Sequence, residues 1–259
     1  MIFISIGQIK LCDSKRVEKS QYDIIYSDIL NDEYWNLAIL KNGDIDLKAV
    51  WETIKQDMKA LNRQPILYLF SNKENDKLNK QLGQCKLENI YTDVWMIIDN
   101  LQNFKTYESK INVQISKVDL HEKNEFIQTV MDGFSSDDPK DPYGRLPEEY
   151  RTFYEKEFSK KGEYSTIEYC GKYDGEMIAT ANVWYKGDTA IIYTVSTKKK
   201  YQKQGVCKKM MSYIINDLNQ LGIKTVCVQT EQGFYTEQIY KNIGFQEVML
   251  GRAYEEKGV

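Results

Sequence analysis

Apolar side chains recur at helical spacing in three stretches of the chain, and each pattern predicts a helix with one buried face. The first set is Leu47, Trp51, Ile54, Met58 and Leu61. The second is Phe126, Ile127, Val130, Met131 and Phe134. The third is Val206, Met210, Ile214, Leu218 and Leu221, and Gly222 is placed to end that helix.

Residues 165–197 hold strand-forming side chains divided by turn signals at Gly171, Asp174-Gly175 and Gly187-Asp188. This pattern predicts an antiparallel meander of three strands. Further helices are predicted from Pro147 to residue 161 and over 236–245, and further strands over 225–230 and 245–250. The order of helices and strands predicts a mixed α/β (α+β) fold with a largely antiparallel sheet.

The first half of the chain has a similar order. A helix over 46–62 precedes a strand over 65–70, a short helix ending at Gly83 and a strand over 90–98. The sequence therefore predicts a duplicated unit, although a chance order of elements is the alternative. The boundary is expected within residues 100–112, between domains 1–105 and 110–259.

Two further expectations concern the first half. The apolar start, residues 1–14, is predicted to be a strand, because it has no basic leader and no small-residue cleavage site. Trp35, Trp51 and Trp95 are expected in the core of this half.

Composition excludes several classes of protein. The chain has 259 residues, 42% of them apolar, and a net charge of -3, which favours a folded protein without the basic field that nucleic acid attracts. No apolar run is long enough to span a membrane, and we expect a cytoplasmic protein. Five scattered cysteines predict reduced thiols, and the single histidine, His121, excludes most serine-triad and zinc-hydrolase mechanisms. His121 is expected in the first turn of a helix, after a capping box.

The strongest chemical signal lies between the third meander strand and the long helix. Gln202, Lys203, Gln204 and Gly205 lead directly into the helix, with Val206, Cys207, Lys208 and Lys209 as its first residues. A glycine here lets the backbone approach a ligand closely, and the free N–H groups of the first turn bind phosphate. The lysines add positive charge. A solvated, lysine-rich connection is the alternative.

This stretch resembles the acyl-CoA binding motif of the GNAT superfamily of N-acetyltransferases, Gln/Arg-x-x-Gly-x-Gly/Ala. Gln202 and Gly205 match it, whereas Cys207 stands where glycine or alanine is usual. The residues before it match the family's lead-in at Val195, Thr197 and Tyr201, with Lys199 in place of a proline. Downstream, Tyr240, Gly244 and Phe245 resemble the family's Leu-Tyr-x-x-x-Gly-Phe ending. The resemblance covers residues 112–259.

The resemblance implies a GNAT fold that transfers an acetyl group from acetyl-CoA to an amine, without a metal. The backbone of Tyr193, Thr194 and Val195 would hold the pantetheine and polarise the thioester carbonyl. The amides of residues 203–208 would bind the diphosphate. Tyr240 would donate a proton to the departing thiolate, although packing of its short helix is the alternative role.

Three features depart from the family pattern. The family's general base lies on the central strand or on the strand after the long helix, and here neither has an acidic residue before Glu231. Glu168 and Glu231 are candidates only by proximity, and ordered water or an amine with a lowered pKa could serve equally. The family's asparagine is replaced by Gly233. The first half has no Gln/Arg-x-x-Gly-x-Gly motif, and four residues before its Gly83 it has Asn79, whereas the second half has Tyr240 four residues before Gly244. These differences predict that the first half is a degenerate GNAT-like copy. Such a copy would shape the acceptor cleft or an interface.

The acceptor is expected to be a small-molecule or protein amine. Acidic residues in the proline-rich loop would attract a cation such as a polyamine, an aminoglycoside or a lysine; a plain surface loop is the alternative. These residues are Asp137, Asp138, Asp141, Glu148 and Glu149. A homodimer is compatible with the sequence. The alternative function is a CoA-binding sensor or scaffold module without catalysis.

Overall fold

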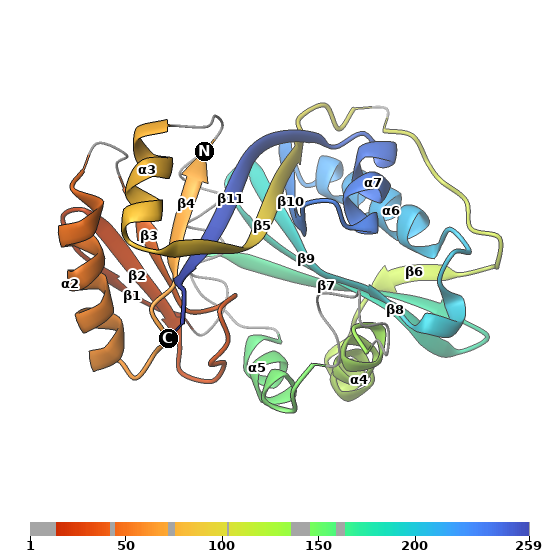
Figure 1. Ribbon diagram of the computed structural model, residues 1–259. Helices are drawn as coiled ribbons and strands as arrows, with labels where there is room; N and C mark the ends of the chain where they lie inside the picture. Colours follow the sequence, from red (N-terminus) through yellow and green to blue (C-terminus); the bar gives the residue numbers. More distant parts are fainter. Residues whose placement is uncertain are drawn as a thin grey trace. The chain divides into compact units, whose positions relative to one another are not determined.

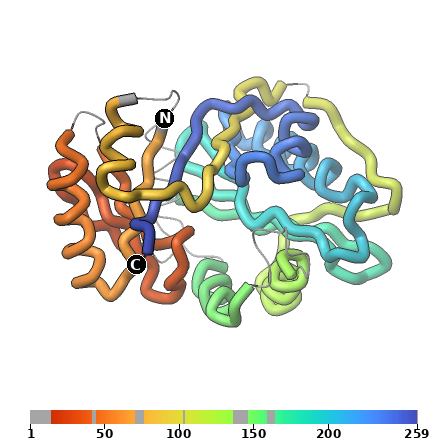
Figure 2. Tube along the Cα trace, in the orientation of Figure 1, coloured from red at the N-terminus to blue at the C-terminus, as the bar shows by residue number. Residues whose placement is uncertain are grey.

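The chain forms two compact units, which are described separately here (Figures 1 and 2). The computed structural model describes residues 14–41, 45–71, 76–102, 104–135, 146–158 and 164–258. Unit 1 contains Ile97–Val228 and Ile239–Gln246. Unit 2 contains the described residues before Ile97, together with Gln229–Gln238 and the residues from Glu247 onward.

Unit 1 is built on the predicted meander. Its strands are β7 (Ser165–Tyr173), β8 (Glu176–Lys186) and β9 (Thr189–Thr197), which pair in antiparallel order. The short strand β6 (Gln114–Lys117), which the sequence analysis did not predict, pairs with β7 at one edge. At the other edge β10 (Thr225–Glu231) pairs with β9 in parallel. The sheet is therefore mixed and mostly antiparallel, as predicted.

Helices cover both faces of this sheet. On one face lie α4 (Lys123–Gly133) and α5 (Glu149–Glu157), and the Thr129 hydroxyl of α4 donates to the Met177 carbonyl at the start of β8. On the other face lies α6 (Val206–Gln220), where Asp217 accepts a hydrogen bond of 2.5 Å from the Tyr169 hydroxyl of β7. The 3-10 turns η1 (Leu120–Glu122) and η2 (Lys199–Tyr201) precede α4 and α6, and α7 (Tyr235–Ile243) follows β10. His121 lies in η1, the turn that the capping box of Asp119 and Glu122 begins, as predicted.

The apolar stripe of α6 is buried except at its end. Val206, Met210, Ile214 and Leu218 are buried, as predicted. Leu221 is 47% exposed, so this part of the prediction was wrong. The helix ends at Gln220, and Leu221 is the capping residue that turns the chain away from the sheet. In α4, Phe126, Ile127 and Val130 form the buried face.

Unit 2 holds a sheet in the order β1-β2-β3-β4-β11-β5. Its strands are β1 (Ser14–Glu18), β2 (Tyr22–Ser27), β3 (Leu37–Leu40), β4 (Leu67–Ser71), β5 (Leu87–Ile98) and β11 (Gln246–Glu256). Its helices are α2 (Leu47–Ala60) and α3 (Asp76–Gln84). The predicted order helix, strand, helix, strand is thus observed, and the C-terminal strand β11 pairs antiparallel with β4. Most of the strand predicted at 1–14 lies outside the described residues.

Two of the three tryptophans expected in the core are there. Trp51 and Trp95 are buried, and Trp51 donates a hydrogen bond to the Glu256 carboxylate. Trp35 is only partly buried, so that prediction was wrong. In the described part of the chain, no helix is long and apolar enough to cross a membrane.

Leu218 and Leu221 provide a matched test of the buried stripe. Leu218→Ala should lower the free energy of unfolding by about 2–5 kcal/mol, because it opens a cavity against the sheet. Leu221→Ala should change it by less than about 0.5 kcal/mol, since that side chain is half exposed. Urea denaturation of the two variants measures both values. Equal losses would contradict the packing described for α6.

A buried carboxyl group lies in the core of unit 2. Asp93 of β5 accepts a hydrogen bond of 2.7 Å from the Tyr68 hydroxyl, and the Trp95 indole donates to the same hydroxyl at 3.2 Å. Burial raises the pKa of Asp93 to about 7, although the hydrogen bonds from Tyr68 and Gln229 oppose this shift. Over the pH range between the unfolded and folded pKa values, the folded chain therefore holds a proton that the unfolded chain has lost.

Asp93 should make stability depend on pH. Its contribution is fully present below about pH 4 and is lost as the pH rises to about 7, because the proton bound to the folded state must then be released. Asp93→Asn should remove this part of the decline between pH 5 and 7, as measured by urea denaturation across that range. Asp28→Asn, at an exposed position, is the control and should leave the slope unchanged. A wild-type slope retained in Asp93→Asn would contradict the assignment.

Candidate active site

Strand β9 contains a bulge at the position expected to hold the thioester. Asn182 of β8 pairs with Tyr193, whereas Thr180, two residues earlier, pairs with Ser196, so β9 carries an extra residue in this interval. Within it, Thr194 has a φ of +54°. This conformation is strained for a β-branched residue, and strained backbone of this kind clusters at functional sites.

The bulge lies beyond the end of the ladder between β9 and β10. The last pair of that parallel ladder is Ile191 with Cys227. Tyr193, Thr194 and Val195 follow it, and their backbone on the side of β10 lies outside the pairing. Ile191 and Ile192 are buried, whereas these three residues are half-buried. The strand thus has half-buried backbone groups outside the pairing with β10.

Gly205 controls how α6 begins. It is the N-terminal capping residue, with a φ of +85°, and no side chain of a described residue caps this helix. Lys203 in the same loop also has a positive φ, of +60°. Amides at the start of an uncapped helix, in a loop of this conformation, bind anions. Val206, Cys207 and Lys208, which follow Gly205, supply these amides.

The structure gives a second reason for a glycine at this position. A Cβ atom on Gly205 would lie 3.1 Å from the Glu108 carbonyl oxygen, so the close approach is to the chain itself. Lys110 N–H and the Ser109 hydroxyl both donate to the Gln204 carbonyl, at 2.8 and 2.9 Å. The close approach of a ligand at Gly205, which its sequence motif predicts, stays a prediction.

Residues 104–111 form a segment that lies against α6 and α7, and Figure 2 shows its course in yellow. Tyr107 N–H donates to the Ser212 hydroxyl of α6, and the Tyr107 hydroxyl donates to the Asn242 carbonyl of α7. The sequence analysis treated these residues only as a boundary. No periodicity marks them, because their partners lie far away in the sequence.

Some side chains of the loop and first helical turn, residues 202–209, bind other parts of the chain, and others remain able to meet a ligand. Gln202 donates to the Thr197 carbonyl at 3.1 Å and so ties the loop to the end of β9. Lys209 pairs with Glu108 at 3.1 Å, and the Lys208 ammonium lies 5.8 Å from the centre of the Tyr107 ring. Lys203 is exposed. Lys203 and Lys208 therefore remain the cations best placed to meet an anion at this loop.

Cys207 has the properties of a packing residue. Burial raises the pKa of its thiol to about 12, so the sulfur carries a proton at neutral pH. A thiol in this state is a poor nucleophile. Cys207 therefore does not offer a covalent acyl-cysteine route.

Tyr240 lies in α7 and is 6% exposed. Its ring packs edge-on against Phe245 at 5.8 Å, and its carbonyl accepts from the N–H groups of Gly244 and Phe245. Gly244 has a φ of +118°, which explains the glycine that ends this helix. Tyr240 thus packs its helix, as the alternative reading expected, and its hydroxyl role stays a prediction.

The acidic candidates are spread over both units. Glu168 of β7 is buried in unit 1, whereas Glu231 is the last residue of β10 and belongs to unit 2. Of the acceptor-loop acids, Glu148 and Glu149 are described and exposed. Asp137, Asp138 and Asp141 lie outside the described residues.

Asp119, His121 and Glu122 come close enough together to share a metal ion. Asp119 and His121 are exposed, and the Glu122 carboxylate already binds the Lys172 ammonium and the Asp119 amide. This local capping arrangement explains the cluster without a metal.

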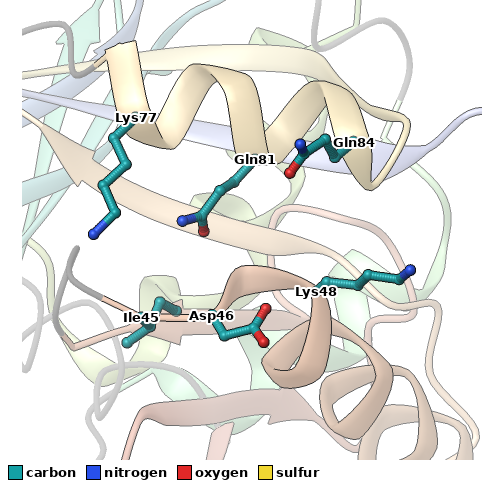
Figure 3. A pocket seen from close by; sticks show the side chains of 6 residues that line it. All are labelled: Ile45, Asp46, Lys48, Lys77, Gln81 and Gln84. Carbon is teal, nitrogen blue, oxygen red and sulfur yellow. The ribbon is translucent and has the colours of Figure 1, made fainter.

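The start of α2 in unit 2 differs from the start of α6. Asp46 caps α2 and accepts from Ala49 N–H, and the Gln81 side chain accepts from Leu47 N–H at 3.0 Å. Beside it is an open hollow of about 460 Å³, lined also by Lys48 and Lys77 (Figure 3). Because the Leu47 and Ala49 amides already donate hydrogen bonds to side chains, the start of α2 does not offer them to a diphosphate.

Comparison with known proteins agrees with the geometry of unit 1. Residues 127–245 match the family model described as Acetyltransferase (GNAT) family. Over 68 residues the chain is 26% identical to [Ribosomal protein bS18]-alanine N-acetyltransferase of Haemophilus ducreyi, a match that spans 26% of this chain and about half (47%) of that relative.

Solved structures with the same fold cover nearly the whole chain. A GCN5-related N-acetyltransferase from Kribbella flavida is 14% identical, with a TM-score of 0.69, and the match covers 99% of this chain and 93% of that one. A tandem GNAT protein from the clavulanic acid biosynthesis pathway is 8% identical, with a TM-score of 0.61 and coverage of 90% and 77%. The chain has the GNAT fold, and its residues 127–245 are similar to the GNAT acetyltransferase family, whose model they match.

Proposed function

We propose that the chain is an N-acetyltransferase that transfers the acetyl group of acetyl-CoA to a primary amine in a ternary complex. The observation that carries this proposal is the uncapped start of α6 at Gly205, in the same unit as the bulge of β9. Acetyl-CoA needs both features, because it has a diphosphate at one end and a reactive carbonyl at the other.

The diphosphate would bind at the start of α6. The N–H groups of Val206, Cys207 and Lys208 provide neutral donors, and the helix dipole adds positive character. Lys203 and Lys208 contribute charge. Gln202 and the 104–111 segment hold the loop in place before any ligand arrives, which lowers the entropy cost of binding.

The thioester would lie at the β9 bulge. Backbone N–H groups near Thr194 would polarise its carbonyl as the amine attacks, in the manner of an oxyanion hole. Holding both substrates there turns a bimolecular reaction into a local one. The amine would attack the thioester directly, and the raised pKa of the buried Cys207 thiol, which makes it a poor nucleophile, supports this route.

Tyr240 would protonate the departing CoA thiolate. A phenol has an ordinary pKa of about 10 and so carries its proton at neutral pH. The family position of this tyrosine and its location in unit 1 support the assignment. Its edge-on contact with Phe245 fixes the ring.

The acceptor class is a primary amine of a small molecule or a protein. The curated relative is named for the alanine of a ribosomal protein, which supports a protein amine as one member of that class. We place the enzyme in the cytoplasm, where acetyl-CoA is available. Unit 2 would be a degenerate GNAT-like copy that does not bind CoA, because Asp46 and Gln81 occupy the amides of α2.

A CoA-binding module without catalysis is the second candidate. It is favoured by one observation, the absence of an acidic residue on β9. A module of this kind would bind CoA and release no thiol with any amine. Titration calorimetry with CoA, followed by a free-thiol assay with acetyl-CoA and a panel of amines, distinguishes the two functions.

Gly205 and Gly222 form a matched pair for testing the diphosphate site. Both have positive φ, +85° and +81°, at opposite ends of α6. Gly205→Ala should weaken CoA binding at least about tenfold, because the left-handed conformation costs about 1–2 kcal/mol for alanine and its Cβ would press on Glu108. Gly222→Ala places an alanine in the same left-handed conformation, but its Cβ would contact no other atom of the described residues. CoA affinity should therefore stay within about twofold. Full CoA affinity in Gly205→Ala would contradict the site.

Tyr240→Phe tests the proton donor. Turnover should fall about tenfold or more with CoA affinity little changed, because the ring remains and only the hydroxyl is lost. Tyr235→Phe, in the first turn of the same helix and 56% exposed, is the control and should keep the wild-type rate. Steady-state assays of thiol release give both values. An unaltered rate in Tyr240→Phe would exclude Tyr240 as the acid.

A further inference from the structure

Three polar side chains form a row across the meander of unit 1. The strand register places Glu168 of β7 opposite Asn182 of β8, and Asn182 opposite Tyr193 of β9. Residues directly opposite on neighbouring strands point to the same face of a sheet, with Cβ atoms about 4.5–5.5 Å apart. The row therefore runs from the interior of the sheet to the bulge at Thr194.

The row faces α4. Thr180 precedes Asn182 by two residues and so points to the same face. Its hydroxyl lies 2.7 Å from the Ser196 hydroxyl, and Ser196 packs against Gly133 at the end of α4. On β7, Tyr169 points the other way, towards α6. The polar row thus lies on the face opposite α6, next to the end of α4.

Asn182 is buried without a hydrogen-bond partner. It is 6% exposed, and its Oδ1 atom has no contact with water and no donor within reach. A buried polar atom left unpaired destabilises a protein, so such an atom in a native fold requires an explanation, and a bound ligand that donates to it is one. Asn36 of unit 2 shows the usual situation: it is equally buried, and its amide makes bonds to Ser27 N–H, the Arg63 guanidinium and two carbonyls.

The Asn182 side-chain oxygen can accept a hydrogen bond from a ligand that has N–H groups. The neighbour on one side, Glu168, has a carboxyl group that attracts a cation and accepts a proton. The neighbour on the other side, Tyr193, belongs to the half-buried stretch where the thioester would lie. An ammonium group satisfies all these requirements together, whereas an anion or an apolar ligand satisfies none of them.

We infer that Asn182 and Glu168 bind the primary ammonium group of the acceptor, with Asn182 positioning its nitrogen and Glu168 acting as the general base. This inference rests on the proposed acetyl transfer. It assigns the base that the residues of β9 do not provide, and it chooses Glu168 over Glu231.

The proton balance of the reaction is complete with these groups. Glu168 takes one proton from the ammonium, which frees the nitrogen lone pair. The nitrogen–carbon bond to the acetyl group forms as the carbon–sulfur bond breaks, and the thiolate takes the Tyr240 proton. The nitrogen sheds a second proton, which restores Tyr240, and the proton on Glu168 passes to solvent. The products are the amide, CoA and one released proton.

Asn182→Leu separates this role from a structural one. The variant removes an unpaired polar atom and keeps the number of side-chain heavy atoms, so its melting temperature should stay the same or rise. The KM for the amine should rise about tenfold or more, because a hydrogen bond to a charged donor is lost. Asn36→Leu is the matched control. It should lower the melting temperature by about 4 °C or more, because Ser27 N–H and two carbonyl groups lose their hydrogen-bond partner.

Glu168→Gln tests the base through its pH dependence. With the acceptor chosen from a panel of spermidine, kanamycin and alanyl- and lysyl-peptides, kcat/KM should fall about 100-fold at pH 7. The deficit should shrink towards pH 10, because the free amine is then already neutral. A purely structural effect would be the same at every pH. Asn182→Ala repeats the KM measurement should the leucine variant fail to fold.

The outcomes separate this inference from the function on which it rests. If wild-type protein binds CoA but releases no thiol with any amine, the acetyl-transfer proposal itself fails, and the inference with it. If wild-type protein is active while Asn182→Leu keeps its amine KM, or Glu168→Gln has the same deficit at pH 7 and pH 10, only the inference is overturned.

Discussion

The amide groups at the start of α6 have no side-chain cap among the described residues, and the rest of the site depends on this feature. Gly205 makes it possible, because its φ of +85° turns the chain into the helix without placing a capping side chain over the amides. The 104–111 segment then holds the loop through the Gln204 carbonyl. In α2 the same positions are closed by Asp46 and Gln81. The two helix starts therefore differ: the first amides of α6 have no side-chain cap among the described residues, whereas those of α2 already bind side chains.

The proposed reaction depends on a second departure from regular structure, in the sheet. The ladder between β9 and β10 stops at Ile191, and the bulge at Thr194 follows. Both features withdraw backbone groups from pairing, which costs stability in an isolated sheet. The meander around them is well packed, with buried side chains along β8 and a hydrogen bond between Thr180 and Ser196. A rigid frame therefore supports a small strained region, as active sites require.

Periodicity and turn signals were sufficient to predict the long elements, and they failed where local sequence carries little information. The helix over 46–62 and the meander follow directly from apolar spacing and from the glycine turns. The short strands β1, β2, β3 and β6 were missed. Charged and polar residues fill β1 and β6, and β2 and β3 are only six and four residues long, so pairing with neighbouring strands decides them. The loop at Gly205 was found through its motif, but its contact with Glu108 was not, since that contact joins segments far apart in sequence. The row from Glu168 to Tyr193 depends on the strand register, which the bulge sets and which no single strand reveals.

The most direct test of the account is a crystal structure of the protein with bound coenzyme A. The account predicts that diphosphate oxygens accept hydrogen bonds from the amides that follow Gly205, and that the pantetheine arm runs along the backbone of Thr194. A diphosphate bound in the hollow beside α2, or a loop at Gly205 that stays empty at saturating coenzyme A, would contradict it.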